Sequence, residues 1–244
     1  MNTSLGKQIL AAAREADFAH AGEEEAIERA LRSIPKDSTH KVLDVGCGRG
    51  GTADYVARNG WGRVTGIDRD PESILYAKRT YPSLEFHVAD VSQLPLIVQP
   101  WFELIYMMNA FYAFDSQREA LVQMRKVAAG SARLAIFDYA DRGGLRDRPL
   151  LLDGAPILPN PIVPGEIERL VERGGWLVDT VEDVTDDYRR WYAALLERID
   201  RKHDEIAAIG DEDAFSYVRS HYQAIHDAIA DGKLGGVIIL ATAI

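Results

Sequence analysis

Short apolar runs alternate with amphipathic stretches along most of the chain. The apolar runs predict buried strands, and stretches with apolar residues three or four positions apart predict helices. The expected strands cover residues 42–45, 63–67, 84–89, 102–107, 133–137, 176–184 and 237–243. The expected helices cover residues 5–16, 23–34, 51–59, 71–80, 116–128, 164–175, 187–208 and 212–230. This alternation is typical of an α/β fold with a doubly wound parallel sheet.

Three segments stand outside this alternation. Residues 1–38 contain two helical stretches and predict an N-terminal helical segment. Residues 141–164 are rich in Gly, Pro, Asp and Arg and predict a long loop, a feature often found at binding sites. The helix pair before the last strand predicts a helical cap over residues 186–232. With 47% hydrophobic residues, the chain can form one large domain over residues 1–244.

The charge balance narrows the choice of partners. Acidic residues outnumber basic ones by 38 to 28, which gives a formal net charge of −10. No block of Lys and Arg offers the positive face that nucleic acid requires, so we expect no nucleic-acid partner. No apolar run approaches the ~20 residues that span a bilayer, and the N-terminus lacks a signal-peptide core. We therefore expect a cytoplasmic protein without a membrane partner.

Cysteine chemistry and metal binding are not expected. The single cysteine, Cys47, excludes an intramolecular disulfide and a cysteine-based zinc site. It lies inside a glycine-rich loop, where a small residue fits, and no His or Asn forms a nucleophile motif beside it. No carboxylate cluster can be assembled for a metal ion either. The sequence therefore predicts no metal centre.

The segment KVLDVGCGRGGTADYV places a glycine-rich turn between a predicted strand and a predicted helix. Gly46, Gly48 and Gly51 fit the dinucleotide pattern G-x-G-x-x-G, whereas Gly46, Gly48 and Gly50 fit G-x-G-x-G. Both patterns point backbone N–H groups and a helix N-terminus at a nucleotide-like ligand. Asp68, at the end of the second strand, suits ribose hydroxyl groups under either interpretation. The glycines alone leave the ligand open.

Two further carboxylates favour a ligand with an ammonium group over a dinucleotide with a pyrophosphate. Asp44 lies two positions before Gly46, at the buried end of the first strand. A pyrophosphate would gain nothing from a carboxylate there, whereas a ligand with an ammonium group would. Asp90, just after the third strand, can accept a hydrogen bond from an adenine amino group. These positions indicate a ligand that carries both an ammonium group and an adenine ring.

The chain resembles the class I S-adenosylmethionine-dependent methyltransferases over residues 41 to about 140. The segments VLDVGCGRGG, GIDRD, VADVSQLP and FELIYMMNAFYAF have the order and spacing of that family's successive motifs. The resemblance implies a Rossmann-like sheet of seven strands, with the last strand antiparallel and next to the sixth. It also implies methyl transfer from S-adenosylmethionine to a small molecule, by in-line displacement at the sulfonium methyl, with S-adenosylhomocysteine as product. An NAD-dependent oxidoreductase and a non-catalytic S-adenosylmethionine-binding protein are the alternatives.

The resemblance also implies which residues hold the cofactor. Asp44, Gly46 and Gly48 would line the methionine part, Asp68 would hold the ribose, and Asn109 would lie near the methionine or the sulfonium. The expected cofactor-binding set is Asp44, Gly46, Cys47, Gly48, Asp68, Arg69, Asp90, Val91 and Asn109. Within this set, the pair Asp90 and Val91 would hold the adenine.

Catalytic and substrate-binding candidates lie outside those motifs. His20 is in a segment, DFAHAGEEEA, that resembles the cofactor-covering region of small-molecule methyltransferases. Asp138 follows the fifth strand, where it could orient an amine or accept its proton, or cap the strand end. The expected substrate-binding residues are Tyr112, Tyr139 and Trp191, because aromatic walls suit a flat or cationic substrate.

The cap helices carry two further expectations. Their histidines, His203, His221 and His226, are expected to be solvated. The helix pair could cover the substrate pocket, or it could instead mediate contacts in a homodimer.

Overall fold

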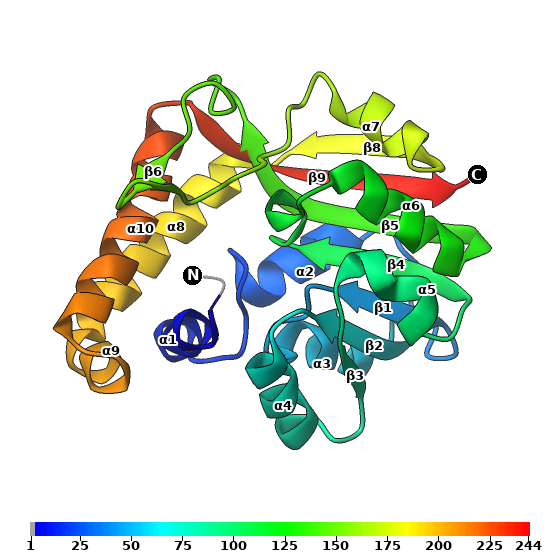
Figure 1. Cartoon of the computed structure of the whole chain (residues 1–244), viewed down its shortest axis with the longest axis horizontal. Coiled ribbons are helices and arrows are strands. Elements are labelled where there is room, and N and C mark those ends of the chain that lie inside the picture. Colours follow the sequence, from blue (N-terminus) through cyan, green and yellow to red (C-terminus); the bar gives the residue numbers. More distant parts are fainter. Residues whose placement is uncertain (1–2) are drawn as a thin grey trace.

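The computed structural model describes residues 3–244; residues 1 and 2 of the expected N-terminal segment lie outside the described part. A seven-stranded sheet has the order β3-β2-β1-β4-β5-β9-β8 (Figure 1). Its strands are β1 (Lys41–Val45), β2 (Arg63–Asp68), β3 (Glu85–Val88), β4 (Phe102–Met108), β5 (Ala128–Asp141), β8 (Trp176–Asp183) and β9 (Leu234–Ala243). Strand β9 runs antiparallel to both β5 and β8, which confirms the expected fold and its reversed last strand.

Helices cover both faces of the sheet. The parallel strands require this cover, because their continuous apolar runs bury side chains on both faces. The α-helices are α1 (Ser4–Arg14), α2 (Glu23–Leu31), α3 (Gly51–Arg58), α4 (Pro71–Thr80), α5 (Leu94–Ile97), α6 (Gln117–Val127), α7 (Ile167–Arg173), α8 (Thr185–Arg201), α9 (His203–Ile209) and α10 (Glu212–Ala230). One core cluster joins the first four helices and the cap to the sheet, through residues such as Ile27, Val56 and Leu195. The other joins α6 and α7 to the opposite face, through Leu121 and Val171.

Two predicted segments differ from the observed ones. Strand β5 is much longer than residues 133–137, because β9 pairs with it as far as Asp141 and β4 pairs with it from Ala128. The segment expected to be a loop, residues 141–164, contains a short hairpin of β6 (Leu151–Leu152) and β7 (Ala155–Pro156).

The cap consists of α8, α9 and α10, which project from the sheet beside α1 (Figure 1). A single helix was expected over residues 187–208, but the chain turns at Lys202, whose Nζ donates to the Ala12 carbonyl at 2.9 Å. Ion pairs join the N-terminal helices to the cap, with nitrogen–oxygen distances of 2.6 Å for Arg190–Glu25 and 2.8 Å for Arg198–Glu23. The two segments therefore form one cover over the same side of the sheet.

Candidate functional site: a cavity at the carboxyl ends of the parallel strands

The glycine loop after β1 has a backbone that only glycine adopts easily. Gly46 has a φ of 84°, and a Cβ atom there would lie 2.6 Å from the Ala110 side chain. Gly48 has a φ of 53°, and a Cβ atom there would have no neighbour within 4 Å, because the loop faces open space. The backbone N–H of Gly48 donates to the Asp68 carboxylate at 2.8 Å. The loop is thus tied to the end of β2 and faces the cavity.

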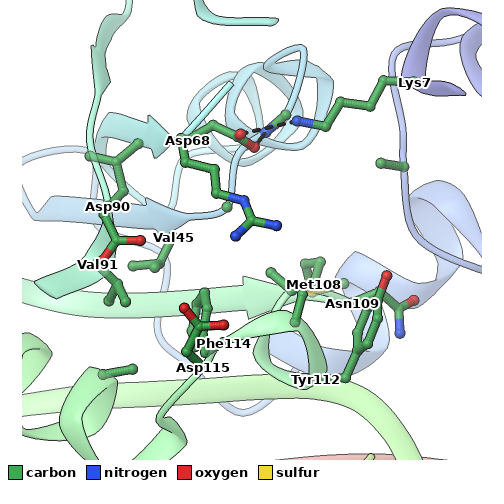
Figure 2. Close-up of a pocket in the computed structure, with 18 of the residues that line it drawn as sticks. Lys7, Val45, Asp68, Asp90, Val91, Met108, Asn109, Tyr112, Phe114 and Asp115 are labelled. Carbon is green, nitrogen blue, oxygen red and sulfur yellow. Dashed lines mark hydrogen bonds and ion pairs between the residues drawn. The ribbon is translucent and has the colours of Figure 1, made fainter. Parts of the chain in front are cut away.

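Asp68 is the centre of a hydrogen-bond network at the end of β2. Its Oδ1 accepts from Lys7 Nζ at 3.0 Å and from the backbone N–H of Asp70 at 2.9 Å. Lys7 reaches this carboxylate from helix α1, as Figure 2 shows. The carboxylate predicted to hold the ribose is therefore fixed by two backbone donors and one cation.

Asp90 and Val91 follow β3 and begin a short 3-10 helix, η1 (Val91–Gln93). The Asp90 carboxylate accepts from the backbone N–H of Ser92 at 2.9 Å and from its hydroxyl at 2.6 Å. These bonds hold the pKa of Asp90 below its usual range, so the carboxylate is ionised at neutral pH. In Figure 2 both residues lie on one side of the pocket, opposite Asn109 and Tyr112.

Asn109 follows β4 and connects three parts of the chain. Its φ is 51°, in the left-handed region that Asn tolerates better than most residues. Its Oδ1 accepts from the backbone N–H of Ala21 at 3.2 Å, and its Nδ2 donates to the Tyr188 hydroxyl at 2.8 Å. The side chain therefore joins the N-terminal segment and cap helix α8 to the sheet.

These groups surround a cavity of about 280 Å³ at the carboxyl ends of the parallel strands. Such ends are where open α/β sheets bind ligands. The predicted site residues that line it are Gly46, Gly48, Asp68, Arg69, Asp90, Val91, Asn109, Tyr112 and Tyr139. The structure therefore brings together most of the predicted cofactor set and two of the three predicted substrate residues.

Two predicted cofactor residues lie behind the cavity wall. Asp44 is 2% exposed, and its carboxyl group accepts from the Tyr106 hydroxyl at 3.0 Å. Burial raises the pKa of Asp44 to about 7. Cys47 is buried as well, and burial raises the pKa of its thiol well above the usual value. A thiol that stays protonated fits the expected role of a small space-filling residue.

The two catalytic candidates are also buried outside the lining. The His20 ring nitrogens lie 3.0 Å from the Ala21 carbonyl and 3.0 Å from the Thr52 hydroxyl, and burial lowers its pKa to about 4. Asp138 accepts from the backbone N–H groups of Phe111, Tyr112 and Tyr139 at 2.7 to 3.1 Å. Burial raises its pKa to about 7. Both side chains already have partners in the protein, so this geometry favours structural positioning over proton transfer.

The aromatic and histidine expectations need correction at two positions. Trp191 does not line the cavity; its ring packs on Gly22, and its Nε1 donates to Glu25 at 2.9 Å. His221 was expected to be solvated, yet it is 6% exposed and lines the cavity with its neighbour Tyr222. His203, by contrast, has a side chain that is 41% exposed and lies between Asp204 and Glu212.

Sequence reasoning missed several lining residues, chiefly Lys7, His221 and Tyr222. For the last two a signal exists, because they share a helix face with buried Val218 and Ile225. Among residues 3–244, no group of three or more His, Cys, Asp or Glu side chains is arranged to hold a metal ion. Within the same range, no helix is long and apolar enough to cross a membrane.

Comparison with known proteins agrees with this site. Residues 42–130 match a family model described as a methyltransferase domain. An O-methyltransferase, cnsE, from Penicillium expansum is 28% identical over 169 residues, which cover 66% of this chain and 60% of that protein. The methyltransferase GfsG from Streptomyces halstedii is 28% identical over 193 residues, covering 75% of this chain and 69% of that protein.

Solved structures share the whole fold at low sequence identity. Phosphoethanolamine N-methyltransferase 2 from Haemonchus contortus, solved with S-adenosylmethionine, superposes with a TM-score of 0.83 at 17% identity. The match covers 99% of this chain and 57% of that one. The [4+2]-cyclase SpnF superposes with a TM-score of 0.81 at 18% identity, over 98% of this chain and 93% of that one.

Fold, site and sequence matches together define an α/β protein with a cavity at the carboxyl ends of its strands. Residues 42–130 match the methyltransferase domain, and the chain as a whole shares the fold of the methyltransferase structures. These matches agree with S-adenosylmethionine as the expected cofactor. The residues fit that group, since the loop leaves open space at Gly48, and the carboxylates of Asp68 and Asp90 lie on the cavity wall.

Proposed function

We propose that the protein transfers a methyl group from S-adenosylmethionine to a small-molecule acceptor. The observation that carries the proposal is that one cavity joins Gly48, Asp68 and Asp90 at one end to Tyr112 and Tyr139 at the other. A nucleoside held by the first group has its reactive end toward the second. Two ligands can therefore meet in one cavity.

The cofactor supplies an activated methyl group on a sulfonium, so the protein needs no covalent intermediate. The task that remains is to hold the acceptor in line and to exclude water. Helix α1 and the cap perform the second task, since the bond from Lys7 to Asp68 and the ion pair between Arg190 and Glu25 keep both over the strand ends. Small acceptors are favoured because the cavity is only about 280 Å³.

Names among the relatives support oxygen as the accepting atom. The relatives from Penicillium expansum, Pyrenophora dematioidea and Aspergillus nomiae are all named O-methyltransferases. The aligned part is 60% of the length of the Penicillium protein, so its activity enters here as a proposal for this chain. The cytoplasmic location and the homodimer stay predictions.

The alternatives differ in what they bind and what they release. An oxidoreductase would be stabilised by NAD, whereas we expect a rise in melting temperature with S-adenosylhomocysteine and none with NAD. A protein that binds the cofactor without turnover would form no S-adenosylhomocysteine. Because the same fold is found in a structure named as a cyclase, the decisive assay measures product and not binding alone.

The experiment incubates the full chain with methyl-labelled S-adenosylmethionine and a small-molecule extract of cells. We expect label in a small, extractable product and equimolar S-adenosylhomocysteine. The Asp68→Asn variant, which retains the shape of the side chain but not its charge, is the matched control. Stabilisation by NAD, or cofactor binding without labelled product in any extract, would refute the proposal.

A further inference from the structure

The segment over residues 141–164 does not line the cavity described above. That cavity runs from a cofactor end at Asp68 and Asp90 to a cap end at Tyr139 and Tyr222. The segment instead borders a second cavity, of about 440 Å³, on the sheet face where α6 and α7 pack. This volume lies in the range of small-molecule sites. The composition of the segment predicted a binding loop, and the space it borders is separate from the first cavity.

The second cavity has an excess of positive charge. The charged side chains that line it are Arg118 of α6, Arg146 of the 141–164 segment, Glu166, and Arg169 and Arg173 of α7. Four cations and one carboxylate leave three positive charges in excess, although the chain has a formal net charge of −10. Cations gathered around one cavity attract small anions and raise their local concentration. We call this space the arginine cavity.

Three of the four arginines have no partner in the protein. Within residues 3–244, the side chains of Arg118, Arg169 and Arg173 form no hydrogen bond and no ion pair. Arg169 and Arg173 are four positions apart on α7, so they share one face of the helix. Glu168 and Glu172 of the same helix do not line the cavity. The charge of these arginines is therefore available to a ligand.

The fourth arginine shows how such a ligand would be held. Arg146 donates through Nη1 and Nη2 to the two carboxylate oxygens of Glu166, at 3.1 and 2.9 Å. This two-point geometry is the one in which a guanidinium group binds carboxylate and phosphate. Both side chains are 61% exposed, and exposed ion pairs of this kind are weak. Glu166 thus occupies one of the four cations of the cavity.

The backbone around the arginine cavity is fixed at three points. The Asp141 carboxylate accepts from the backbone N–H groups of residues 143–146, at 2.8 to 3.1 Å. Gln117 Nε2, at the start of α6, donates to the Asn160 carbonyl at 2.8 Å. Ile167 anchors α7 in the core. Because the elements that carry the arginines are already in place, a ligand need order only their side chains.

We propose that the arginine cavity binds a small anion that contains a diphosphate group. A diphosphate offers several negative charges and enough oxygen atoms for more than one guanidinium group, whereas a single carboxylate satisfies only one. The ligand is neither the cofactor nor the acceptor, since both of those occupy the first cavity. Free diphosphate and nucleoside diphosphates share this chemistry, and the test distinguishes them.

The test measures the affinity of inorganic pyrophosphate by calorimetry, without divalent cations. The full chain is saturated with S-adenosylhomocysteine, which keeps anions out of the first cavity. We expect pyrophosphate to bind about tenfold tighter than orthophosphate, because it can reach more than one arginine. Tighter binding of ADP than of pyrophosphate would assign the site to a nucleotide, and the reverse order to free diphosphate.

Substitution of the three unpaired arginines should weaken binding. Arg118→Gln, Arg169→Gln and Arg173→Gln should each lower the affinity for pyrophosphate about three- to fivefold, and the triple variant about thirtyfold. Arg148→Gln is the matched control, because Arg148 is an exposed arginine of the same segment outside the lining. At about 0.15 M salt its charge is largely screened from the site, so the affinity should stay the same.

Substitution of the one carboxylate should have the opposite effect. Glu166→Gln releases Arg146, so we expect the affinity for pyrophosphate to rise about two- to fivefold. Glu168→Gln, which changes the net charge equally outside the lining, should leave it unchanged. The substituted side chains are exposed, so all variants should keep the wild-type melting temperature.

Four results would overturn the inference: no binding of pyrophosphate, equal binding of orthophosphate, an unchanged affinity in the triple variant, or an equal loss in Arg148→Gln. Failure of the chain to bind S-adenosylhomocysteine would instead refute the proposed function. The arginine variants report on the second cavity whether or not the first is filled, so the two failures are distinguishable.

Discussion

The cofactor end of the cavity is built from residues close together in sequence, whereas the cap end joins residues from both halves of the chain. At the cofactor end, backbone N–H groups of the glycine loop and the turn after β2 hold Asp68. At the cap end, side chains from α10 line the same cavity as Tyr112, which follows β4, and Tyr139, which lies in β5. The first end is fixed by the backbone, and the second by the packing of rings. We therefore expect substitutions at the two ends to affect different ligands.

The largest effect is expected for Gly46→Ala. The new Cβ would lie 2.6 Å from that of Ala110, at a φ of 84° that disfavours any side chain. The loop must shift, so we expect the affinity for S-adenosylhomocysteine, measured by calorimetry, to fall about a hundredfold, or about 2.7 kcal/mol. Gly60→Ala is the matched control, because Gly60 has a similar φ of 88° but open space around it.

In Gly60→Ala only the backbone strain remains. We expect a loss of about 1–2 kcal/mol in the free energy of unfolding and no change in cofactor affinity. Equal cofactor affinities in the two variants would show that the close approach to Ala110 does not shape the site.

A smaller effect is expected from pH, through Asp44. Burial raises the pKa of Asp44 to about 7, so below that pH the carboxyl group takes up a proton and no longer attracts an ammonium group. The affinity for S-adenosylhomocysteine should therefore rise with pH and level off above 7. We expect about a tenfold gain in calorimetry between about pH 6 and pH 7.5.

Two controls isolate the carboxylate. The nucleoside 5′-methylthioadenosine lacks the amino-acid part, so its affinity should not change over this pH range. Asp44→Asn should flatten the pH profile of S-adenosylhomocysteine. A pH profile that is the same for both nucleosides would exclude Asp44 as the partner of the amino group.

We expect a substitution in the cover to lower the free energy of unfolding without changing the affinity for the cofactor. Trp191→Phe retains a ring on Gly22 but loses the hydrogen bond to Glu25, whose carboxylate still pairs with Arg190. We expect a loss of about 1 kcal/mol in the free energy of unfolding, measured with urea. The affinity for S-adenosylhomocysteine should stay the same.

Trp101→Phe is the control for this change in ring size, because Trp101 is 60% exposed and should tolerate it. Weaker cofactor binding in Trp191→Phe would mean that the cover and the cofactor end are coupled.

The difference between the two ends also explains what the sequence could predict. The fold and the cofactor end rest on local signals: an apolar strand, a glycine turn, a helix and an acid at the next strand end. Asp68, Asp90 and Gly48 therefore line the cavity as expected. The cap end depends on which face of a helix packs against a distant strand. A local sequence pattern does not predict that long-range contact.

Three residues show which positions could not be predicted from local sequence patterns. His221 carries the helical periodicity of a buried face, but the polarity of histidine favoured an exposed position, and packing decided otherwise. His20 lies in a segment that resembles the cofactor-covering region of methyltransferases. Its ring nitrogens nevertheless contact the Ala21 carbonyl and the Thr52 hydroxyl and do not line the cavity. Lys7 has no sequence signal at all, because its role depends on where α1 docks.

The smallest effect is expected for Lys7→Met, at a contact between helix α1 of the cover and the cofactor end. Lys7 Nζ lies 3.0 Å from Asp68 Oδ1, but the backbone N–H groups of Gly48 and Asp70 hold that carboxylate without it. Both side chains of this pair are only 10% exposed, but the carboxylate keeps its two backbone donors when Lys7 is replaced, so we expect the affinity for S-adenosylhomocysteine, measured by calorimetry, to fall only about two- to threefold. A loss as large as that of Gly46→Ala would mean that helix α1, and not the backbone of the strand ends, fixes the cofactor.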